Sequence, residues 1–327
     1  MIGPWGQPES VSGQVDPRDV RTGSSLRFQR RRSRTATPSS DAVGRPRAHI
    51  RYGVKRTSSN EESLADLGGK RSMPFVNLLG YRINRSGLEA TATRCRDAVV
   101  RQERIHHVSL NAAKVVRARD DQALRAVLQA AQLVNADGQS LVWASRLLGD
   151  PLPERVAGID LMFRLLEIAE AEGFRVYFLG ARADVLDRAL EDLRVVHPTL
   201  AIAGSHHGYF DAHENAEICN HINGANADIL FVAMSSPRKE YWVAECGRML
   251  EVPLIMGVGG ALDVVAGAVA RAPHWVQNAG FEWAFRLLQE PRRMWRRYLS
   301  TNLQFVGIVS AALAVRILQR FSADDSA

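Results

Sequence analysis

Leu133-Val134-Asn135-Ala136-Asp137-Gly138 is the stretch of this 327-residue chain that decides the fold. A short apolar run ends in an acid and a glycine, and the helix-like residues 139–148 follow directly. In open α/β sheets, ligands bind beyond the carboxyl ends of such strands. Asp137 has two interpretations: it caps the helix that follows, because Asp is a favoured N-cap, or its carboxylate takes part in chemistry.

The same alternation of apolar runs and amphipathic helices continues along the chain. The expected strands are residues 104–110, 133–136, 174–179, 200–203, 228–233 and 253–258. The expected helices between them are residues 112–130, 139–148, 159–171, 183–196, 214–222 and 240–250. Alternation of this kind is typical of βαβ units. We therefore predict an α/β fold, with a Rossmann-like, mostly parallel sheet flanked by helices, in a core domain at residues 73–270.

Polar residues and glycines follow each expected strand, so they gather at one edge of the sheet. Besides Asp137-Gly138, they are Ser109-Leu110-Asn111, Gly180-Ala181-Arg182, Gly208-Tyr209-Phe210, Ser235-Ser236-Pro237-Arg238-Lys239 and Gly257-Val258-Gly259-Gly260. The last stretch lacks the GxGxxG spacing of a dinucleotide fingerprint, which disfavours an NAD-dependent oxidoreductase. We expect its glycines to allow a tight turn whose backbone N–H groups face a phosphate.

The net charge of +7 and the isoelectric point of about 9.7 suit an anionic partner. Residues 1–72 are rich in Arg, Ser, Gly and Pro around Arg30-Arg31-Arg32-Ser33-Arg34, and show no hydrophobic period. We predict a disordered basic extension there. It is either an arm that binds acidic lipid or nucleic acid, or a non-essential extension with Met73 as the true start.

Residues 271–327 form a predicted helical appendage rich in Arg and Trp. Basic and aromatic residues precede residues 303–315, which are mostly apolar. About 13 residues are too few to span a bilayer but suit a helix lying at its surface. We expect membrane contact; the alternative is a helix docked on the protein's own core.

Cysteine and histidine usage gives little sign of a metal site. Cys95, Cys219 and Cys246 are isolated and fit small buried residues in a reducing compartment. Adjacent residues of a strand, such as His106 and His107, point to opposite faces, and His206-His207 lacks a nearby carboxylate at usual ligand spacing. No Asp-x-Asp pair occurs in the chain. We therefore expect neither a metal nor another cofactor.

The chain from about residue 109 to residue 298 resembles the WecG/TagA/CpsF glycosyltransferases, glycosyltransferase family 26. The matching stretches are Ser109-Leu110-Asn111, Asn135-Ala136-Asp137-Gly138, Arg155 to Leu161, Phe178-Leu179-Gly180-Ala181, Gly208-Tyr209-Phe210, Ser236-Pro237-Arg238-Lys239-Glu240, Gly257-Val258-Gly259-Gly260 and Arg271 to Tyr298. The resemblance implies an inverting enzyme that moves a hexosyl or N-acetylhexosaminyl group from a UDP-sugar to a polyprenyl-diphosphate-linked saccharide. It would act on the inner face of the cytoplasmic membrane, in exopolysaccharide or cell-surface polysaccharide biosynthesis. The oligomeric state stays open, a homo-oligomer included.

The resemblance also implies roles for individual residues. Asp137 resembles the general base that takes the proton of the acceptor hydroxyl. Ser109 and Asn111 look like the polar pair of the acceptor pocket, and Arg155 looks like an arginine that binds a phosphate or carboxylate. The other substrate-binding candidates are Gly180, Ala181, Gly208, Tyr209, Pro237, Lys239, Glu240 and Gly259. The C-terminal arginines that close over the diphosphates are similar to Arg286, Arg293 and Arg296.

One residue departs from the family pattern, because the family usually has Gln where Lys239 stands. A lysine favours a diphosphate electrostatically, but it cannot accept a hydrogen bond from a sugar hydroxyl as an amide oxygen can. Two other functions stay open from the sequence: a non-catalytic nucleotide-sugar-binding protein of an assembly complex, and a nucleic-acid-binding protein that uses the basic arm. We do not expect nucleic acid as a partner.

Overall fold

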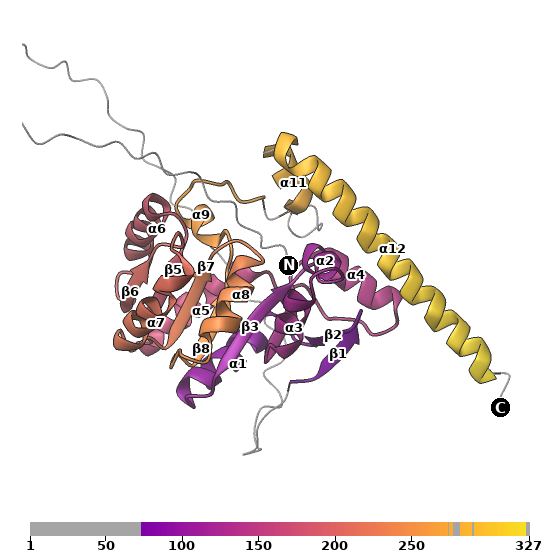
Figure 1. The fold of residues 1–327 in the computed structure, drawn as a ribbon, viewed down its shortest axis with the longest axis horizontal. Helices are drawn as coiled ribbons and strands as arrows, with labels where there is room; N and C mark the ends of the chain where they lie inside the picture. Colours follow the sequence, from indigo (N-terminus) through magenta and orange to yellow (C-terminus); the bar gives the residue numbers. More distant parts are fainter. Residues whose placement is uncertain (1–72, 274, 277–281, 290, 325–327) are drawn as a thin grey trace, which may run out of the picture. The chain divides into compact units, whose positions relative to one another are not determined.

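The computed structural model describes residues 73–273, 275–276, 282–289 and 291–324 (Figure 1). Its centre is a six-stranded sheet of order β4-β3-β8-β7-β5-β6, in which every neighbouring pair is parallel. The strands are β3 Ile105–Leu110, β4 Leu133–Ala136, β5 Val176–Gly180, β6 Ile202–His206, β7 Ile229–Ala233 and β8 Leu254–Gly257. The predicted fold class is therefore confirmed. The predicted extension at residues 1–72 lies outside the described residues.

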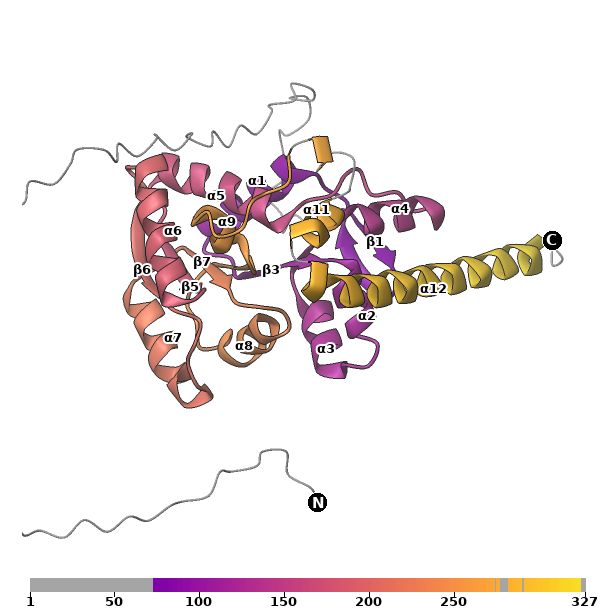
Figure 2. The same cartoon turned by 90° about the horizontal axis from the view of Figure 1, so that it is seen from above.

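Helices cover both faces of this sheet. They are α1 Leu88–Val100, α2 Ala112–Arg117, α3 Gln122–Ala130, α4 Gln139–Leu147, α5 Gly158–Glu172, α6 Ala183–Val196, α7 Asn215–Gly224, α8 Arg238–Cys246, α9 Ala261–Val265, α11 Glu282–Gln289 and α12 Pro291–Asp324, with a 3₁₀ turn η1 at Ala212–Glu214. Figure 2 shows α1 and α5 on one side of the strands, and α7 and α8 on the other. Because both faces are covered, β5 and β7 are buried at every residue, which explains their unbroken apolar sequence.

The core contains the three cysteines, as expected. Cys95, Cys219 and Cys246 are buried free thiols. On one face of the sheet, side chains of β5, β7 and β8 pack against α7 and α8, with Tyr177 and Trp242 among the largest. Small apolar thiols in such a core contribute packing rather than chemistry.

Two predicted elements differ most from the structure, and a third, the helix expected at residues 240–250, runs instead from Arg238 to Cys246. The single helix expected at residues 112–130 is two helices, because Asp121 accepts a hydrogen bond from the Leu124 N–H (2.9 Å) and so caps a new helix, α3. The strand expected at residues 200–203 runs instead from Ile202 to His206. This edge strand is only half-buried along its length, so its sequence is less apolar and its bounds were harder to predict.

An antiparallel hairpin precedes the sheet and was not expected. It comprises β1 Phe75–Leu78 and β2 Tyr81–Asn84, four residues each, which is too short for a clear periodicity. The Asn84 side chain accepts a hydrogen bond from the Val134 backbone N–H (2.8 Å). The hairpin is thereby joined to β4, the strand that leads to Asp137.

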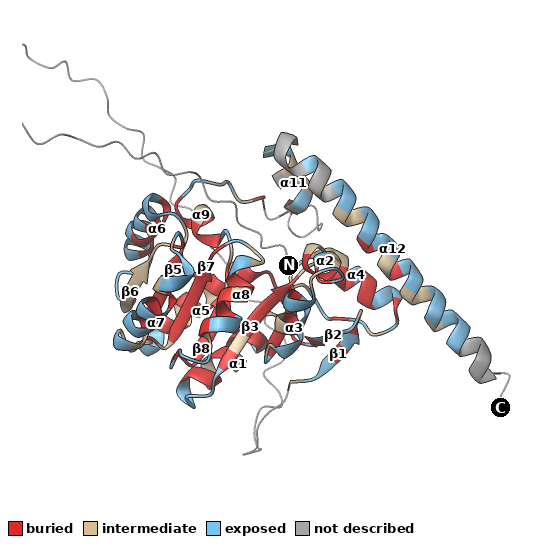
Figure 3. Cartoon of the chain, viewed as in Figure 1, coloured by how far each residue is buried: buried red, intermediate tan, exposed pale blue. Residues whose placement is uncertain are grey.

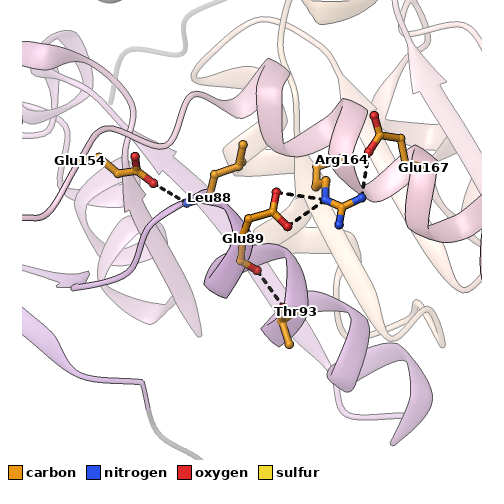
Figure 4. A network of polar contacts seen from close by, with 6 residues as sticks. All are labelled: Leu88, Glu89, Thr93, Glu154, Arg164 and Glu167. Carbon is orange, nitrogen blue, oxygen red and sulfur yellow. Dashed lines mark hydrogen bonds and ion pairs between the residues drawn. The ribbon is translucent and has the colours of Figure 1, made fainter. Parts of the chain in front are cut away.

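A network of charged side chains joins α1 to α5 (Figure 4). The Arg164 guanidinium donates to Glu89 at the start of α1 (3.0 Å) and to Glu167 on its own helix (2.8 Å). Glu154, just before α5, accepts a hydrogen bond from the Leu88 N–H (2.8 Å). These contacts tie the beginning of α1 to α5 and to the segment that precedes it.

The C-terminal helix α12 is 34 residues long, and most of its residues whose burial is described are exposed (Figure 3). Its apolar stretch is Leu299–Gln319, 21 residues, which is long and apolar enough to cross a membrane. The expectation that this segment is too short to span was therefore wrong, because the apolar pattern extends beyond residues 303–315. One side of the helix, at Phe305 and Val309, is buried in the core with the hairpin and α2, whereas Leu299, Leu303 and Val306 are exposed.

Candidate active site

Asp137 lies at the carboxyl end of β4, directly beside the end of β3. Its backbone N–H donates to the Leu110 carbonyl (2.6 Å), one residue past the last paired residues of the two strands. The N-cap of α4 is Gly138, with φ +133°. Asp137 therefore does not occupy the N-cap position, which was the first of its two interpretations from the sequence. A side chain at Gly138 would be strained in this conformation. The chain therefore turns into the helix at Gly138 and leaves the carboxylate at the edge of the sheet.

The first residue of α5 lies against Asp137 and Ser109. A Cβ at Gly158 would stand 2.8 Å from the Ser109 Oγ and 3.9 Å from the Asp137 Oδ2. The Ser109 Oγ is buried, without a hydrogen-bond partner among the described residues. The 15-residue helix thus begins at a carboxylate and a hydroxyl, and the absent side chain of Gly158 makes this close approach possible.

Asn111, the second member of the predicted polar pair, caps a helix. Its side-chain oxygen accepts a hydrogen bond from the Lys114 N–H (3.0 Å) at the start of α2. Its contact with substrate remains a prediction. The residue that sequence reasoning missed is Lys114, whose buried ammonium donates to the Ser109 carbonyl (2.6 Å). A lysine at an inward position of an amphipathic helix is the signal that could have revealed it.

Lys114, Glu240 and Lys239 form a buried ion cluster behind Ser109. The Glu240 Oε1 lies 2.9 Å from the Lys114 Nζ and 3.0 Å from the Lys239 Nζ. These residues are 2–7% exposed. The cluster joins α2 to the start of α8, and so connects the end of β3 with the loop that follows β7.

The pKa values of this cluster reflect burial and mutual attraction. Burial alone would raise the pKa of the Glu240 carboxyl, but the two ammonium groups outweigh it and lower the pKa to about 2. Burial, together with Lys114, lowers the pKa of Lys239 to about 8, against the opposing effects of Glu240 and Asp137. Asp137 therefore lies within the electrostatic reach of Lys239.

The predicted nucleotide side lies at the ends of β5, β6 and β7. The Gly208 N–H donates to the Ala181 carbonyl (2.7 Å), which brings these two loops together. Gly180 has φ +101°, and a Cβ there would lie 2.5 Å from the Ala233 carbonyl oxygen, so only glycine fits. Tyr209 is 67% exposed at this edge and is available to a ligand. The loops therefore stand together at the same sheet edge as Asp137.

Two further predicted substrate-binding residues lie in the middle of this edge. Pro237 follows a cis peptide bond with Ser236 and immediately precedes α8. Gly259 has φ +56° in the turn after β8. The turn and the start of α8 are in contact, because a Cβ at Gly257 would stand 2.9 Å from the Lys239 Cε.

Arg155 binds a carboxylate within the protein itself. Its guanidinium donates to the Glu282 carboxylate of α11 (2.9 Å), and both side chains are partly buried. Arg271 makes a second ion pair with Asp160 in the first turn of α5. The beginning of the C-terminal appendage is thus fastened near the first residues of α5. The side chains of Arg286, Arg293 and Arg296 lie outside the described part of the structure.

A buried polar network supports the strand that carries Asp137. Asn135 donates its amide to Thr91 of α1 (3.1 Å), and its Oδ1 lies 3.2 Å from the His107 Nε2. Burial lowers the pKa of His106 to about 4 and that of His107 to about 3, so both rings are neutral at neutral pH. Within this network, His107 is a structural hydrogen-bonding residue.

Two other features of the described residues could hold a ligand. Asp211, His213 and Glu214 are close enough together to share a cation, yet Asp211 and Glu214 already form the capping box of η1. A pocket of about 320 Å³ lies between the hairpin, α2, α3 and α12, lined by Arg119, Ile308 and their neighbours. Neither feature contributes a residue to the predicted catalytic group.

A model of the glycosyl transferase WecG/TagA/CpsF family matches residues 76–318, most of the chain. The chain belongs to the WecG/TagA/CpsF family. The resemblance that the sequence motifs carried is therefore confirmed, and the match includes the hairpin, the sheet and most of α12.

Membership makes the chain a glycosyltransferase of polysaccharide biosynthesis and implies, in general terms, a nucleotide-sugar donor and a lipid-linked acceptor. This agrees with an α/β sheet whose carboxyl edge brings together glycine-rich loops, a carboxylate and buried positive charge.

Proposed function

We propose that this WecG/TagA/CpsF glycosyltransferase transfers a hexosyl or N-acetylhexosaminyl group from a UDP-sugar to a polyprenyl-diphosphate-linked saccharide, with inversion. The product would enter a bacterial exopolysaccharide or cell-surface polysaccharide. The observation that carries the proposal is the meeting of Asp137, Ser109 and the first residue of α5 at the sheet edge. The loops at Gly180 and Gly208, on the other half of that edge, would hold the nucleotide.

In this mechanism the Asp137 carboxylate accepts the proton of the acceptor hydroxyl. The hydroxyl oxygen forms a bond to the anomeric carbon of the donor, while the bond from that carbon to the diphosphate oxygen breaks and leaves its electron pair on UDP. A base within hydrogen-bond reach contributes roughly 10²–10⁴-fold to such a reaction. Attack from the face opposite the leaving group inverts the anomeric centre.

The leaving diphosphate needs positive charge, which a metal or cationic side chains can supply. We propose that Arg286, Arg293 and Arg296 supply it, in a reaction that requires no metal. The ion pair of Arg155 with Glu282 supports this role, because it fastens the start of the arginine-bearing segment to the chain next to α5. Arg155 then acts by holding that segment in place.

We also propose that the enzyme works on the inner face of the cytoplasmic membrane as a peripheral protein. Leu299, Leu303 and Val306 expose apolar surface on α12, while Phe305 and Val309 pack in the core. A spanning helix would have to withdraw that packed side from the protein. A helix that stays docked on the protein can keep the packing of Phe305 and Val309 and also place its exposed apolar side chains in the membrane interface.

The test is a panel of UDP-sugars, including UDP-glucose, UDP-N-acetylmannosamine and its uronic acid, with synthetic polyprenyl-diphosphate saccharides in detergent. Released UDP is measured with and without EDTA. We expect release that requires acceptor, selects one donor and persists in EDTA. Tight UDP-sugar binding without turnover on any acceptor would instead identify a non-catalytic binding protein. Binding of RNA or DNA that disappears on removal of residues 1–72 would favour the nucleic-acid alternative.

A further inference from the structure

The pocket of about 320 Å³ beside α12 is built by three separate parts of the chain. The turn between β1 and β2 forms one wall, α2 and α3 form the second, and Gly307, Ile308 and Ala311 of α12 form the third. The Gln129 side chain of α3 donates a hydrogen bond to the Gly80 carbonyl (3.1 Å) and so holds the first two walls together. The pocket is therefore part of the folded structure and not a loose gap at its surface.

Two arginines give this pocket a positive charge. Arg119, between α2 and α3, and Arg125, on α3, are both exposed and line it, and none of its described lining residues is acidic. The Arg125 guanidinium donates to the neutral Ala118 carbonyl (3.0 Å), and because a guanidinium carries several N–H donors, it can bind an anion as well. The buried side chains of Tyr81 and Val115 supply apolar surface. Guanidinium groups beside apolar surface suit a phosphate that is attached to a hydrocarbon.

The pocket opens toward the exposed apolar surface of α12. Leu303, Gly307 and Ala311 follow one another at i, i+4 spacing, so they form one row along the helix. Leu303 is 64% exposed, whereas Gly307 and Ala311 line the pocket. The row therefore leads from the free apolar surface of the helix to the two arginines. A free phosphate ion would leave this row unused, so the row favours an anion with an apolar tail.

We propose that this pocket binds the phosphate headgroup of an anionic membrane phospholipid, with Arg119 and Arg125 on the phosphate and the lipid tails against the free apolar side of α12. The inference rests on the membrane contact of α12 in the proposed function and goes beyond it. Attraction of basic residues to an anionic surface requires no pocket, whereas a headgroup site makes the contact depend on particular residues.

Gly307 allows the pocket to be filled without disturbing the core. A Cβ at Gly307 would meet no heavy atom within 4 Å beyond its own stretch of helix, so a larger side chain has room there. Gly307→Leu adds apolar surface to α12 and favours the helix. If α12 met the membrane through its apolar side alone, this variant would bind vesicles at least as well as the wild type. If a headgroup occupies the pocket, the variant loses binding to anionic vesicles.

The test is sedimentation of the full-length protein with vesicles of phosphatidylcholine, alone or mixed with phosphatidylglycerol, at one salt concentration. We expect the wild type to prefer the anionic vesicles. Arg119→Gln should lower binding to them roughly fivefold, the contribution of one basic residue at a membrane surface. Gly307→Leu should lower it at least as much and leave binding to phosphatidylcholine unchanged or stronger.

The matched control is Arg194→Gln, which removes an exposed arginine from α6, on the side of the molecule away from α12 (Figure 2). It should change binding to anionic vesicles less than about twofold, because screening limits the reach of its charge. Thermal unfolding of each variant establishes that it is folded.

An unchanged preference for anionic vesicles in either folded pocket variant would overturn this inference, as would a wild type that binds both vesicles equally. Calorimetric binding of inorganic phosphate that Arg119→Gln abolishes, with the vesicle preference retained, would instead make the pocket a site for a free anion. A raised acceptor KM in Gly307→Leu, with the vesicle preference retained, would place the hydrocarbon tail of the acceptor there.

Failure of the proposed function gives different results. If the membrane contact of α12 is wrong, the wild type binds neither kind of vesicle. If the transfer reaction is wrong, no UDP is released, while the vesicle measurements keep their outcome. The failures are therefore distinguishable.

Discussion

Replacing Glu240 with Gln tests the buried cluster most severely, because the change leaves Lys114 and Lys239 without their shared counter-ion. Glu240 is 2% exposed, and its pKa is lowered from 4.5 to about 2. A difference of roughly 2.5 units corresponds to about 3 kcal/mol at neutral pH. Removal of one partner of a buried ion pair costs about 3–5 kcal/mol in other proteins, which agrees in size.

The assay is urea unfolding of the wild type, Glu240→Gln and the control Glu191→Gln, which changes an exposed glutamate of α6. We expect a loss of about 3 kcal/mol for Glu240→Gln and less than about 0.5 kcal/mol for the control. Since the carboxyl pKa is lowered in the folded state, its stabilising effect is complete above pH 4.5. It is lost as the pH falls toward 2, so the gap between the wild type and the variant should narrow there.

A double substitution adds an internal check. Lys239→Met in the Glu240→Gln background removes one of the two buried cations that have lost their shared carboxylate, so it should restore part of the lost stability. A loss below about 1 kcal/mol for Glu240→Gln, or a loss independent of pH between 4.5 and 2, would refute the reasoning.

Three further predictions concern other parts of the fold. Gly180→Ala should lower the free energy of unfolding by on the order of 3 kcal/mol and weaken donor binding. The control Gly173→Ala, also at positive φ but in open space, should cost about 1 kcal/mol. Equal losses of stability in urea unfolding would contradict the close contact between Gly180 and Ala233. Turnover should fall by the same factor in Arg155→Gln, in Glu282→Gln and in the double variant, because each change breaks the same ion pair. A greater loss of turnover in Arg155→Gln than in Glu282→Gln would mean that Arg155 touches substrate. Leu303→Asp should reduce binding to anionic vesicles and leave the stability of the protein unchanged. Phe305→Ala should lower the stability by about 3 kcal/mol, because that side chain is buried. Vesicle binding unaffected by Leu303→Asp would exclude α12 as the membrane contact.

The sequence predicted those features that depend on periodicity and turn chemistry. All six strands of the parallel sheet, and the edge at which glycines and polar residues gather, follow from apolar runs that end in such residues, and α6 has the predicted bounds. The break between α2 and α3 was missed because one capping aspartate, Asp121, outweighs a continuous helical pattern. The short hairpin at β1 and β2 has too few residues to show a period.

The composition of the site was predictable only in part. The loops that carry Asp137, Ser109 and Gly180 were identified, because they directly follow strands. The pairing of Glu240 with Lys114 was not predicted, since it joins residues more than a hundred positions apart. The same holds for Arg155, whose carboxylate partner proved to be Glu282 of the protein itself. Residues that meet through tertiary packing leave no local pattern in one sequence.

The central claim is that the carboxylate at the tip of β4 is the base of the transfer reaction. The most direct measurement is UDP release by Asp137→Asn with saturating donor and acceptor, alongside calorimetric UDP-sugar binding. The substitution keeps the size of the side chain and removes its basicity. We predict that turnover falls by about 10²–10⁴-fold while donor affinity stays within a few-fold of the wild type. Turnover at the wild-type rate would contradict the account.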